Sequence, residues 1–510
     1  MGRAVSFPSH HQPEDRGLAF WMKRTLERLA DFRSDPSINT VHDLRVALRR
    51  CRSIAAVMEE IDPHPDWEEM RDCARKLFRS LGALRDAQAL AEWLNYLHPE
   101  EETTAEAQMK RQVLEELASR EKAANERLQH RAARFDQNRW RKLSRTLVTR
   151  MRRVPAESDA ARCLAFERLE EVKELHRRAM RAESAKPWHG LRIGVKHFRY
   201  TVESLLPVAH AEWIDSLKRV QDVLGNIHDL DVLGGILKKT AASQPGDTIQ
   251  DWETKIAGER HKNIETYRQL SLGTTGVWNT FLAGFPRDSW QRYADARIRA
   301  TRGAMDTKPA RSLVTRRIAV RLWSQLRISK AGQAFSDKKE QRALQAAANL
   351  IGVRDPRFRK PREKFARTFL LESPVPPRWS FAEWERVAWA VRFQRGAEPG
   401  PQNKRFAKLA PEQQAKICLL AGILRLAIAL QRCGVQSSSC VRLEVLPQGF
   451  LLHAAGVQDS PKNAARLTEA KGLLERNLGK TILIQAEAEA AVHATTAKPS
   501  SGPLPISVVR

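Results

Sequence analysis

The chain has 510 residues, of which 87 are Lys or Arg and 60 are Asp or Glu, so its formal net charge is +27. With 42% hydrophobic and 29% charged residues, the composition excludes a largely disordered chain, and the length allows about two to four domains. The charge predicts a polyanionic partner: nucleic acid, polyphosphate or an anionic membrane surface. Only four Tyr are present and the 13 Trp are scattered, so no aromatic platform for stacking bases is evident.

Metal sites, disulfides and membrane spans are not expected. The six Cys form no C-x-x-C pair and no cluster with His, which argues against a metal site and a disulfide framework. Residues 1–16 lack the apolar segment of a signal peptide and have the composition of a flexible arm. The most apolar run, Leu419 to Leu430, is interrupted by Arg425 and is too short to span a bilayer. We therefore expect a soluble cytoplasmic protein.

A first helix is predicted over Leu18 to Phe32, and a basic helix follows it. One face of this second helix carries four residues at i, i+3, i+7 and i+10: His42, Arg45, Arg49 and Arg52. Apolar residues lie off this face and can be buried: Leu44, Val46 and Leu48. Like charges at this spacing repel by about 0.2–0.5 kcal/mol per pair, which an anionic ligand would offset. A solvated basic face is the alternative interpretation for this helix taken alone.

The same pattern recurs 147 positions later. The second basic face carries His189, Arg192, Lys196 and Arg199. Each face is followed by a Leu-Gly motif that ends in Asp, at 81–86 and at 224–229, so these motifs are 143 positions apart. Two motifs in the same order at nearly the same separation indicate an internal duplication. Arg50 and His197 lie off the two faces, and we expect them to be structural or to lie at a rim.

Further charges accompany the second motif. The long helix predicted over 67–97 contains Lys76, and Arg219 stands at the equivalent position of the second copy. The motifs end in Asp86 and Asp229. These carboxylates could orient the Arg and His side chains of the two faces, or they could form ion pairs that only close the bundle. The sequence leaves both interpretations open.

The other elements of the first 300 residues are also helical. Residues 100–153 predict a long helix or hairpin that is broken near Pro155, and further helices are predicted over 160–183 and 252–270. A looser, Gly-containing stretch at 272–286 begins a domain boundary that is complete by about residue 305.

The duplicated motifs resemble those of the CHAD domain, a helical domain with conserved histidines. The resemblance covers roughly residues 15–300 and rests on the order of both motifs in both copies. It implies two pseudo-symmetric helical halves, about 17–155 and 160–300, around a central basic channel. It also implies binding of inorganic polyphosphate without catalysis.

The second half of the chain has a different composition. Residues 311–367 hold 16 Lys or Arg against 4 Asp or Glu, which makes a second basic patch. Apolar helical spacing follows over 383–394 and 411–433. Alternating residues then predict a hairpin around Pro447-Gln448-Gly449, a helix over Lys462 to Leu478 ended by Gly479, and a closing strand over Thr481 to Gln485. Residues 486–510 are rich in Ala, Ser, Thr and Pro, as in a disordered tail.

This half resembles the C-terminal portion of exopolyphosphatase/guanosine-pentaphosphate phosphatase enzymes over about 311–485. The resemblance rests on segments 389–395, 409–412 and 419–430 and on the β-β-α-β end. Where those enzymes carry a His-Asp pair, this chain has Leu350-Ile351, and where they read R-Y-H-R it reads Arg392-Phe393-Gln394-Arg395. Their actin-like catalytic domain is missing. The resemblance therefore implies a degenerate, HD-like helical domain.

The sequence as a whole predicts a mainly α protein. We expect an arm at 1–16, a duplicated helical bundle at 17–300, an HD-like helical domain at 311–435, a small α+β unit at 440–485 and a tail at 486–510. The predicted function is non-catalytic binding of inorganic polyphosphate in a basic channel, with the second half as an accessory or regulatory module. The expected binding residues are His42, Arg45, Arg49, Arg52, Lys76, His189, Arg192, Lys196, Arg199 and Arg219, supported by Asp86 and Asp229. No catalytic residue, metal or cofactor is expected, and polyphosphate granules are one place where such a protein could reside.

Two other functions stay open at this point. One is a polyphosphate or guanosine-polyphosphate hydrolase, in which His42 and His189 would act as bases instead of donating hydrogen bonds to phosphate. The other is nonspecific binding of nucleic acid or another polyanion, which rests on charge alone. Phosphate release in Mg²⁺ or Mn²⁺ separates the enzyme from the binder, and direct competition separates nucleic acid from polyphosphate.

Overall fold

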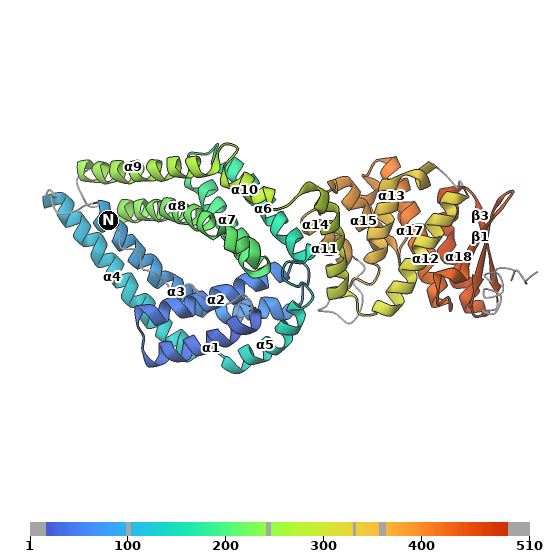
Figure 1. Cartoon of the computed structure of the whole chain (residues 1–510), viewed down its shortest axis with the longest axis horizontal. Helices are drawn as coiled ribbons and strands as arrows, with labels where there is room; N and C mark the ends of the chain where they lie inside the picture. Colours follow the sequence, from blue (N-terminus) through green and yellow to red (C-terminus); the bar gives the residue numbers. More distant parts are fainter. Residues whose placement is uncertain (1–16, 98–103, 241–245, 330–332, 356–363, 488–510) are drawn as a thin grey trace, which may run out of the picture. The chain divides into compact units, whose positions relative to one another are not determined.

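The computed structural model describes residues 17–97, 104–240, 246–329, 333–355 and 364–487 (Figure 1). Two compact units make up the chain. Unit 1 is Met1–Ala300 with Pro376–Arg378, and unit 2 is Thr301–Val375 with Trp379–Arg510. The arm expected at 1–16 and nearly all of the tail expected at 486–510 lie outside the described residues.

Unit 1 is built from α-helices that follow one another through short connections. The first five are α1 (Leu18–Ser34), α2 (Ile38–Met58), α3 (Pro65–Leu97), α4 (Thr104–Ala133) and α5 (Gln137–Met151). The next are α6 (Asp159–Ala179), α7 (Ala185–Leu205), α8 (Pro207–Thr240), α9 (Gly246–Ser271) and α10 (Val277–Ala283), and a 3₁₀ turn (Arg287–Ser289) leads into α11 (Trp290–Met305).

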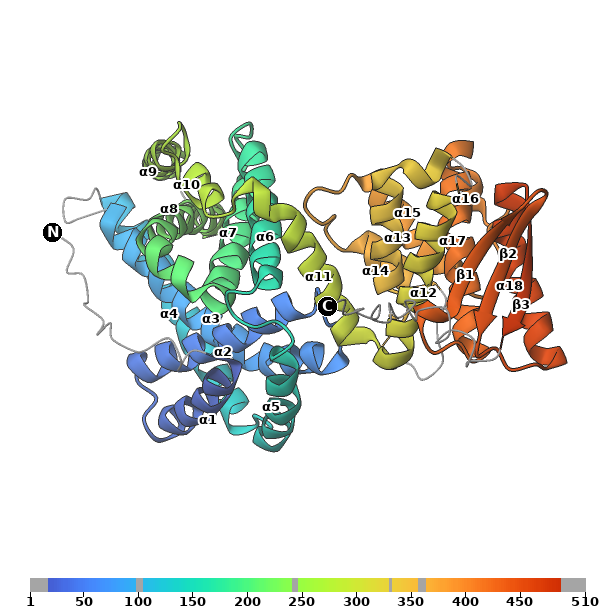
Figure 2. The same ribbon diagram turned by 45° about the vertical axis from the view of Figure 1, so that its right-hand side comes forward.

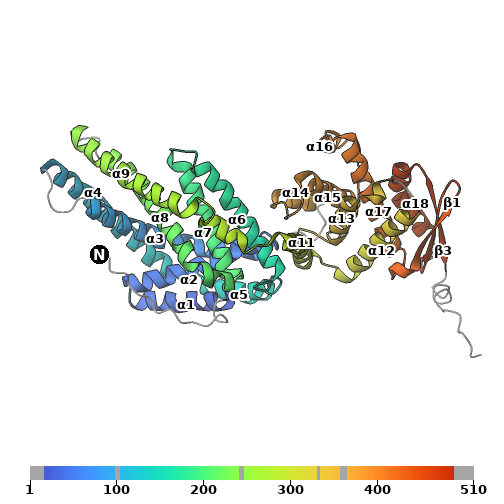
Figure 3. The ribbon, with the colours of Figure 1, turned by 45° about the horizontal axis from the view of Figure 1, so that its top comes forward.

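The helices α1–α4 and α6–α9 form two similar successions. The basic helices α2 and α7 have 21 residues each, and the long helices that follow them, α3 and α8, have 33 and 34. In both successions the long helix packs along the helix after it, α3 on α4 and α8 on α9 (Figures 1 and 3). The two successions meet where α2 packs on α7 and α3 packs on α8.

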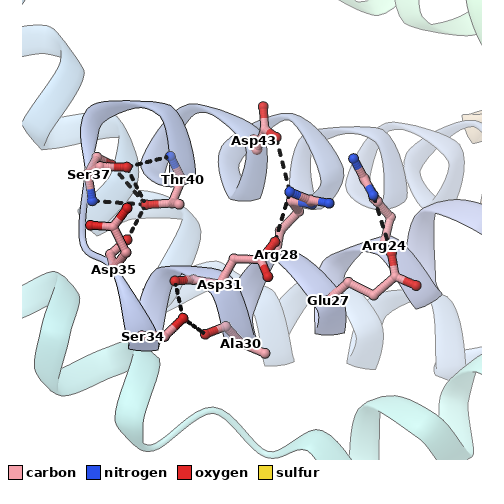
Figure 4. A network of polar contacts seen from close by, with 10 residues as sticks. All are labelled: Arg24, Glu27, Arg28, Ala30, Asp31, Ser34, Asp35, Ser37, Thr40 and Asp43. Atoms are coloured by element: carbon pink, nitrogen blue, oxygen red, sulfur yellow. Dashed lines mark hydrogen bonds and ion pairs between the residues drawn. The ribbon is translucent and has the colours of Figure 1, made fainter.

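The first turn of α2 is fixed by polar contacts with its N-terminal neighbours (Figure 4). Ser37 and Thr40 form a capping box, in which the Ser37 amide donates to Thr40 Oγ1 at 3.0 Å and the Thr40 amide donates to Ser37 Oγ at 3.4 Å. One turn further on, Arg28 of α1 lies 3.5 Å from Asp43 and 2.8 Å from Asp31. These contacts define the start of the helix that carries the first basic face.

The apolar side of α2 anchors it in the core of unit 1. Leu44, Ala47, Leu48 and Cys51 are fully buried there, whereas Val46 is only partly buried. Helical spacing therefore separates an apolar face from the basic face, as the sequence predicts. A basic face held in this way cannot move away from its neighbours without exposing the core.

Buried ion pairs cross-link the helices of unit 1. Arg297 Nε lies 2.9 Å from Glu167 Oε1, and both side chains are almost fully buried. Asp62, which is completely buried, accepts hydrogen bonds from Arg150 Nε at 2.6 Å and from Trp67 Nε1 at 3.2 Å. Burial raises the pKa of the Glu167 carboxyl, and the neighbouring Arg297 charge opposes that shift.

Unit 2 combines helices with a three-stranded sheet. Its helices after α11 are α12 (Pro309–Ile328), α13 (Lys338–Asn349), α14 (Phe365–Glu372), α15 (Phe381–Phe393), α16 (Lys404–Ala407), α17 (Pro411–Arg432) and α18 (Pro461–Leu478), with 3₁₀ turns at Gln333–Ser336 and Ser438–Cys440. The strands are β1 (Val441–Leu446), β2 (Gly449–Ala455) and β3 (Thr481–Glu487). They lie in the order β1-β2-β3, with β1 antiparallel and β3 parallel to β2 (Figure 2).

The mainly α class with a small α+β end is confirmed. The hairpin, the helix and the closing strand lie where the sequence predicts them, and Gly479 ends α18 in the left-handed conformation with φ +64°. Two details differ. The stretch at 272–286, which looked loose, contains the short helix α10, because Val277, Trp278 and Phe281 are buried. Residues 104–151 form two helices separated by a turn at Arg134–Asp136.

The apolar run at 419–430 lies within α17, whose bounds agree with the helical spacing that the sequence shows over 411–433. Helix α17 has 22 residues and, by length and composition alone, is long and apolar enough to cross a membrane. In its most apolar window 72% of the residues are buried, as in a core helix. Gly422 lets α18 approach closely, since a Cβ there would lie 3.0 Å from the backbone of Leu474. The interrupting Arg425 is itself buried and is bonded to backbone carbonyls.

Replacing Arg297 by Met should destabilise unit 1 strongly, because Glu167 would be left buried without its cation. Breaking a buried ion pair in this way typically costs about 3–5 kcal/mol. Urea unfolding of the full chain measures the loss. The matched control is Arg297→Met with Glu167→Leu, which removes both charges and should recover most of the stability. A single variant as stable as the wild type would contradict the structural role of this pair.

Candidate functional site

A cavity of about 920 Å³ lies in unit 1 between four helices. Helix α2 contributes Arg45, Arg49, Arg52, Ser53 and Ala56, and α7 contributes His189, Arg192, Ile193, Lys196, His197 and Tyr200. Helix α3 adds Arg71, Phe78, Gly82, Arg85, Asp86 and Ala89, and α8 adds Gln221, Asp222, Gly225, Asn226, His228 and Asp229. Both basic faces and both copies of the Leu-Gly motif therefore line the same space.

The lining is strongly basic. It holds seven Arg or Lys side chains against three Asp, a formal excess of four positive charges with His neutral. The glycines of the two motifs, Gly82 and Gly225, help to keep the space open, because a Cβ at either position would meet nothing within 4 Å. The cavity is thus large and positive, which suits an anion with many oxygen atoms.

Several guanidinium groups of the two faces have buried N–H donors without a hydrogen-bond acceptor among the described residues. These donors are Arg45 Nη1, Arg49 Nε, Arg192 Nε and Arg199 Nε. A buried donor left without a partner costs about 1–3 kcal/mol, more when it is charged, so such groups are rare in folded proteins. Acceptor oxygens of a ligand would satisfy them. The orphaned donors come from α2 and from α7, that is, from both copies of the repeat.

Burial and mutual repulsion lower the pKa values of the cations. The pKa of Lys196 falls to about 8, chiefly through burial and then through the charges of Arg192, Arg45 and Arg49. Burial also lowers the pKa values of Arg45, Arg52 and Arg199, with further lowering by neighbouring arginines. The arginines keep their charge at neutral pH, whereas Lys196 is close to titration.

Two histidines of the second repeat lie against each other. His189 Nδ1 and His228 Nδ1 are 3.2 Å apart, so one ring must carry its proton on Nδ1 and donate it to the other. Burial, followed by the charges of Arg192, His189 and Lys196, lowers the pKa of His228 to about 4. His228 is therefore neutral at physiological pH and can either donate or accept a hydrogen bond.

The carboxylates at the ends of the two motifs act on the cations of the basic faces. Asp86 raises the pKa values of Arg45 and Lys196, although burial outweighs it at both. Burial raises the pKa of Asp229, with a smaller contribution from Asp86, while Arg192 and Lys196 oppose the shift. Both carboxylates therefore lie near the cations of the basic faces, and the orienting role stays a prediction.

Not every residue predicted to bind the ligand lines this cavity. Arg45, Arg49, Arg52, His189, Arg192, Lys196, Asp86 and Asp229 do. His42 instead lines a neighbouring cavity of about 880 Å³, together with Arg45. Arg199 donates a hydrogen bond from Nη1 to Gln221 Oε1 at 3.0 Å, so it holds a lining residue rather than lining the cavity itself.

Lys76 and Arg219 are exposed and do not line the cavity, so their part in binding stays a prediction. Lys76 precedes the lining residue Phe78 by two positions, which is about 200° around the helix. The residues one position earlier in the two copies, Arg75 and Lys218, lie closer to the side of their helices that faces the cavity. Arg75 lowers the pKa of Arg52, and Lys218 opposes the raised pKa of Asp222, so both act on cavity residues.

Some lining residues were missed by the sequence analysis although their spacing could have revealed them. Tyr200 follows Lys196 by one helical turn, and Arg71 stands one turn before Arg75. The ring of Tyr200 lies under Arg49, 5.3 Å from its guanidinium carbon. His197 lies on the lining as well, whereas Arg50 pairs with Glu203 and faces the Trp21 ring at 5.2 Å.

Lys196 should cost the folded protein stability at neutral pH. Its pKa is about 8 in the folded state against 10.5 ordinarily, so between these values the unfolded state binds more protons and stability rises with pH. Lys196→Met should therefore raise the free energy of unfolding at pH 7 by on the order of 1–3 kcal/mol. That gain should shrink at higher pH. Urea unfolding of both proteins at pH 7 and pH 9.5 measures this gain in stability. No gain at pH 7 would contradict the lowered pKa of Lys196.

Comparison with known proteins bears on the same region. A crystal structure of the CHAD domain from the plant Ricinus communis is similar at 22% sequence identity and a TM-score of 0.36, over 49% of this chain and 88% of that one. A comparison with curated proteins gave no match.

A family model described as the CHAD domain matches residues 21–238. The matched range contains both basic faces and both Leu-Gly motifs, the features on which the resemblance rests. The exopolyphosphatase-like resemblance of residues 311–485 has no counterpart in these comparisons and stays a prediction. Residues 21–238, somewhat less than half of the 510 residues, are thus similar in sequence to the CHAD domain family.

Proposed function

We propose that the cavity of unit 1 binds inorganic polyphosphate and holds it without cleaving it. One observation carries this proposal: buried guanidinium donors of both repeats, at Arg45, Arg49 and Arg192, converge on one space and lack acceptors among the described residues. Each phosphate unit of a polyphosphate chain offers acceptor oxygens and a negative charge. Arg side chains can grip such oxygens in pairs, which gives strong charge-assisted hydrogen bonds.

The aromatic side chains of the cavity favour a ligand without bases. Phe78 and Tyr200 are the two aromatic rings on the lining besides histidine, and each already stacks with an arginine. Arg52 lies 5.0 Å from the centre of the Phe78 ring, and Arg49 lies 5.3 Å from that of Tyr200. Single-stranded nucleic acids are usually held by bases stacked on aromatic rings. The lining offers phosphate contacts but little for a base.

Binding of a polyanion would offset the repulsion among the cations of the cavity. A polyanion near Lys196 would raise its pKa from about 8, so the amine would take up a proton when the ligand binds above neutral pH. The pair His189 and His228 would supply further donors at the same wall. Unit 2 would then act as an accessory module of the degenerate phosphatase-like type that its sequence predicts.

Each basic face should be needed for binding a long chain. Arg45→Ala with Arg49→Ala, and separately Arg192→Ala with Lys196→Ala, each remove two charged contacts worth about 1.5–3 kcal/mol apiece before compensation. Either pair should weaken the affinity for long polyphosphate by at least about tenfold in calorimetric titration. Very short chains that reach one wall only should suffer from one pair and not from the other.

The control for these variants is Arg131→Ala with Arg134→Ala, which removes two charges of unit 1 that do not line the cavity. Equal weakening by the control would mean that bulk charge, and not this cavity, holds the ligand. Two short chains bound per protein, each abolished by one pair alone, would mean two independent sites. Release of phosphate from the bound chain in Mg²⁺ or Mn²⁺ would support the hydrolase alternative.

Affinity should fall steeply with salt, because each phosphate contact releases condensed counterions. For nucleic acids the slope of log affinity against log salt is about −0.7 to −0.9 per contact. Titrations of long polyphosphate between 50 mM and 200 mM salt should show a slope of several contacts. The variant Arg45→Ala with Arg49→Ala should have a slope shallower by about two contacts. A slope near zero in the wild type would rule out electrostatic binding.

A further inference from the structure

Unit 2 contains a second, much smaller basic cavity that the proposed function does not use. Its volume is about 170 Å³, against about 920 Å³ for the cavity of unit 1. It is formed where the end of α15 meets α17 and α18. The lining residues are Gln394, Arg395, Gly396, Arg425, Ile428, Ala429, Arg432, Arg466, Glu469 and Ala470. Four arginines thus face a small space that contains one acidic residue.

The fold holds the backbone of this cavity rigidly. Arg425 of α17 is buried, and its Nη1 donates hydrogen bonds to the carbonyls of Phe393 and Gly396, both at 3.1 Å. Its Nη2 donates to the Gly396 carbonyl as well, also at 3.1 Å. Gly396 has φ +69°, a conformation that suits glycine, so the chain turns sharply just after Arg395. Arg425 is therefore a positioning residue that fixes the turn carrying Arg395.

The guanidinium of Arg395 has a buried donor that no described residue satisfies. Its Nε is buried and has no hydrogen-bond acceptor among the residues that the structure describes. Burial, followed by the charges of Arg432 and Arg354, lowers the pKa of Arg395 to about 10, although Asp306 opposes this shift. The side chain stays protonated at neutral pH, and this cation with an unsatisfied buried donor suits an anionic ligand.

The other polar groups of the lining fit the same ligand. Arg466 of α18 is oriented by a hydrogen bond from its Nη1 to Asn463 Oδ1 at 3.0 Å. Glu469 is 78% exposed and lies 4.0 Å from Arg425, so it stays at the rim. The Oε1 atom of the buried Gln394 lacks a partner among the described residues, and a half-turn of this amide would present its NH₂ group instead.

We propose that this cavity of unit 2 binds a single phosphoryl group carrying two negative charges, either as free inorganic phosphate or as the end of a phosphate ester. Its volume suits a compact anion and is too small for an extended chain, while its arginines supply the charge and the donors. The site shares no residue with the cavity of unit 1, so either site can exist without the other.

The test uses the full chain with Arg45→Ala and Arg192→Ala, which removes the competing anion site of unit 1. Calorimetric titration with inorganic phosphate should show one phosphate per protein. Adding Arg395→Gln and Arg432→Gln should weaken this binding by about tenfold or more, as the loss of charge-assisted hydrogen bonds predicts. The matched control, Arg405→Gln with Lys408→Gln, removes two exposed charges of unit 2 and should leave binding unchanged.

Two further measurements keep the result interpretable. Arg432 is exposed, so Arg432→Gln alone should fold normally and still weaken phosphate binding. In the otherwise wild-type chain, Arg395→Gln with Arg432→Gln should leave the affinity for long polyphosphate unchanged, which separates this site from that of unit 1. A nucleoside monophosphate that displaces phosphate would identify an ester as a ligand, and failure to displace it would assign free phosphate.

The proposal is overturned by any of three results. One is absence of phosphate binding in the Arg45→Ala, Arg192→Ala background. Another is equal weakening by the Arg405 and Lys408 control. The last is phosphate binding that survives the loss of both Arg395 and Arg432.

Discussion

The repulsion between cations that face one another across the unit 1 cavity is the constraint on which the rest of this unit depends. Helices α2 and α7 bring like charges together where burial weakens the screening of water, and the pKa of Lys196 is lowered first by burial and then by these neighbouring charges. The opposite sides of these helices must supply the compensating free energy. Buried Leu44 and Leu48 of α2 and the buried Leu191 and Phe198 of α7 do so through the core.

Several arginines elsewhere in unit 1 form ion pairs that cross-link helices, unlike the arginines of the cavity. Arg50, Arg168 and Arg297 each have a carboxylate partner, respectively Glu203, Glu60 and Glu167. Those arginines stabilise the fold by cross-linking helices. Arg45, Arg49 and Arg192 have buried donors without acceptors among the described residues. The same side chain therefore serves two purposes, which differ in whether a carboxylate lies within ion-pair distance of the guanidinium among the described residues.

Much of this arrangement could be predicted from the sequence, because periodicity and repetition are local properties of the chain. The faces at His42 to Arg52 and His189 to Arg199 and the motifs ending in Asp86 and Asp229 could be read directly, as could the hairpin and the Gly479 helix end. The rotation of one helix relative to its neighbour could not be predicted in this way. Whether Arg75 or Lys76 points towards the cavity depends on how α3 is rotated against α2, which is set by packing. The contact of His228 with His189 likewise joins residues 39 positions apart.

The duplication has left the two walls of the cavity chemically unequal. The position held by Arg49 in the first copy is held by Lys196 in the second, 147 positions later. An arginine keeps its charge throughout the physiological range, whereas this lysine titrates near pH 8. The charge at Arg49 is therefore constant over this range, whereas the charge at Lys196 depends on pH. A site built from two copies of one helical unit has thereby acquired, at this pair of equivalent positions, a sensitivity to proton concentration on one side only.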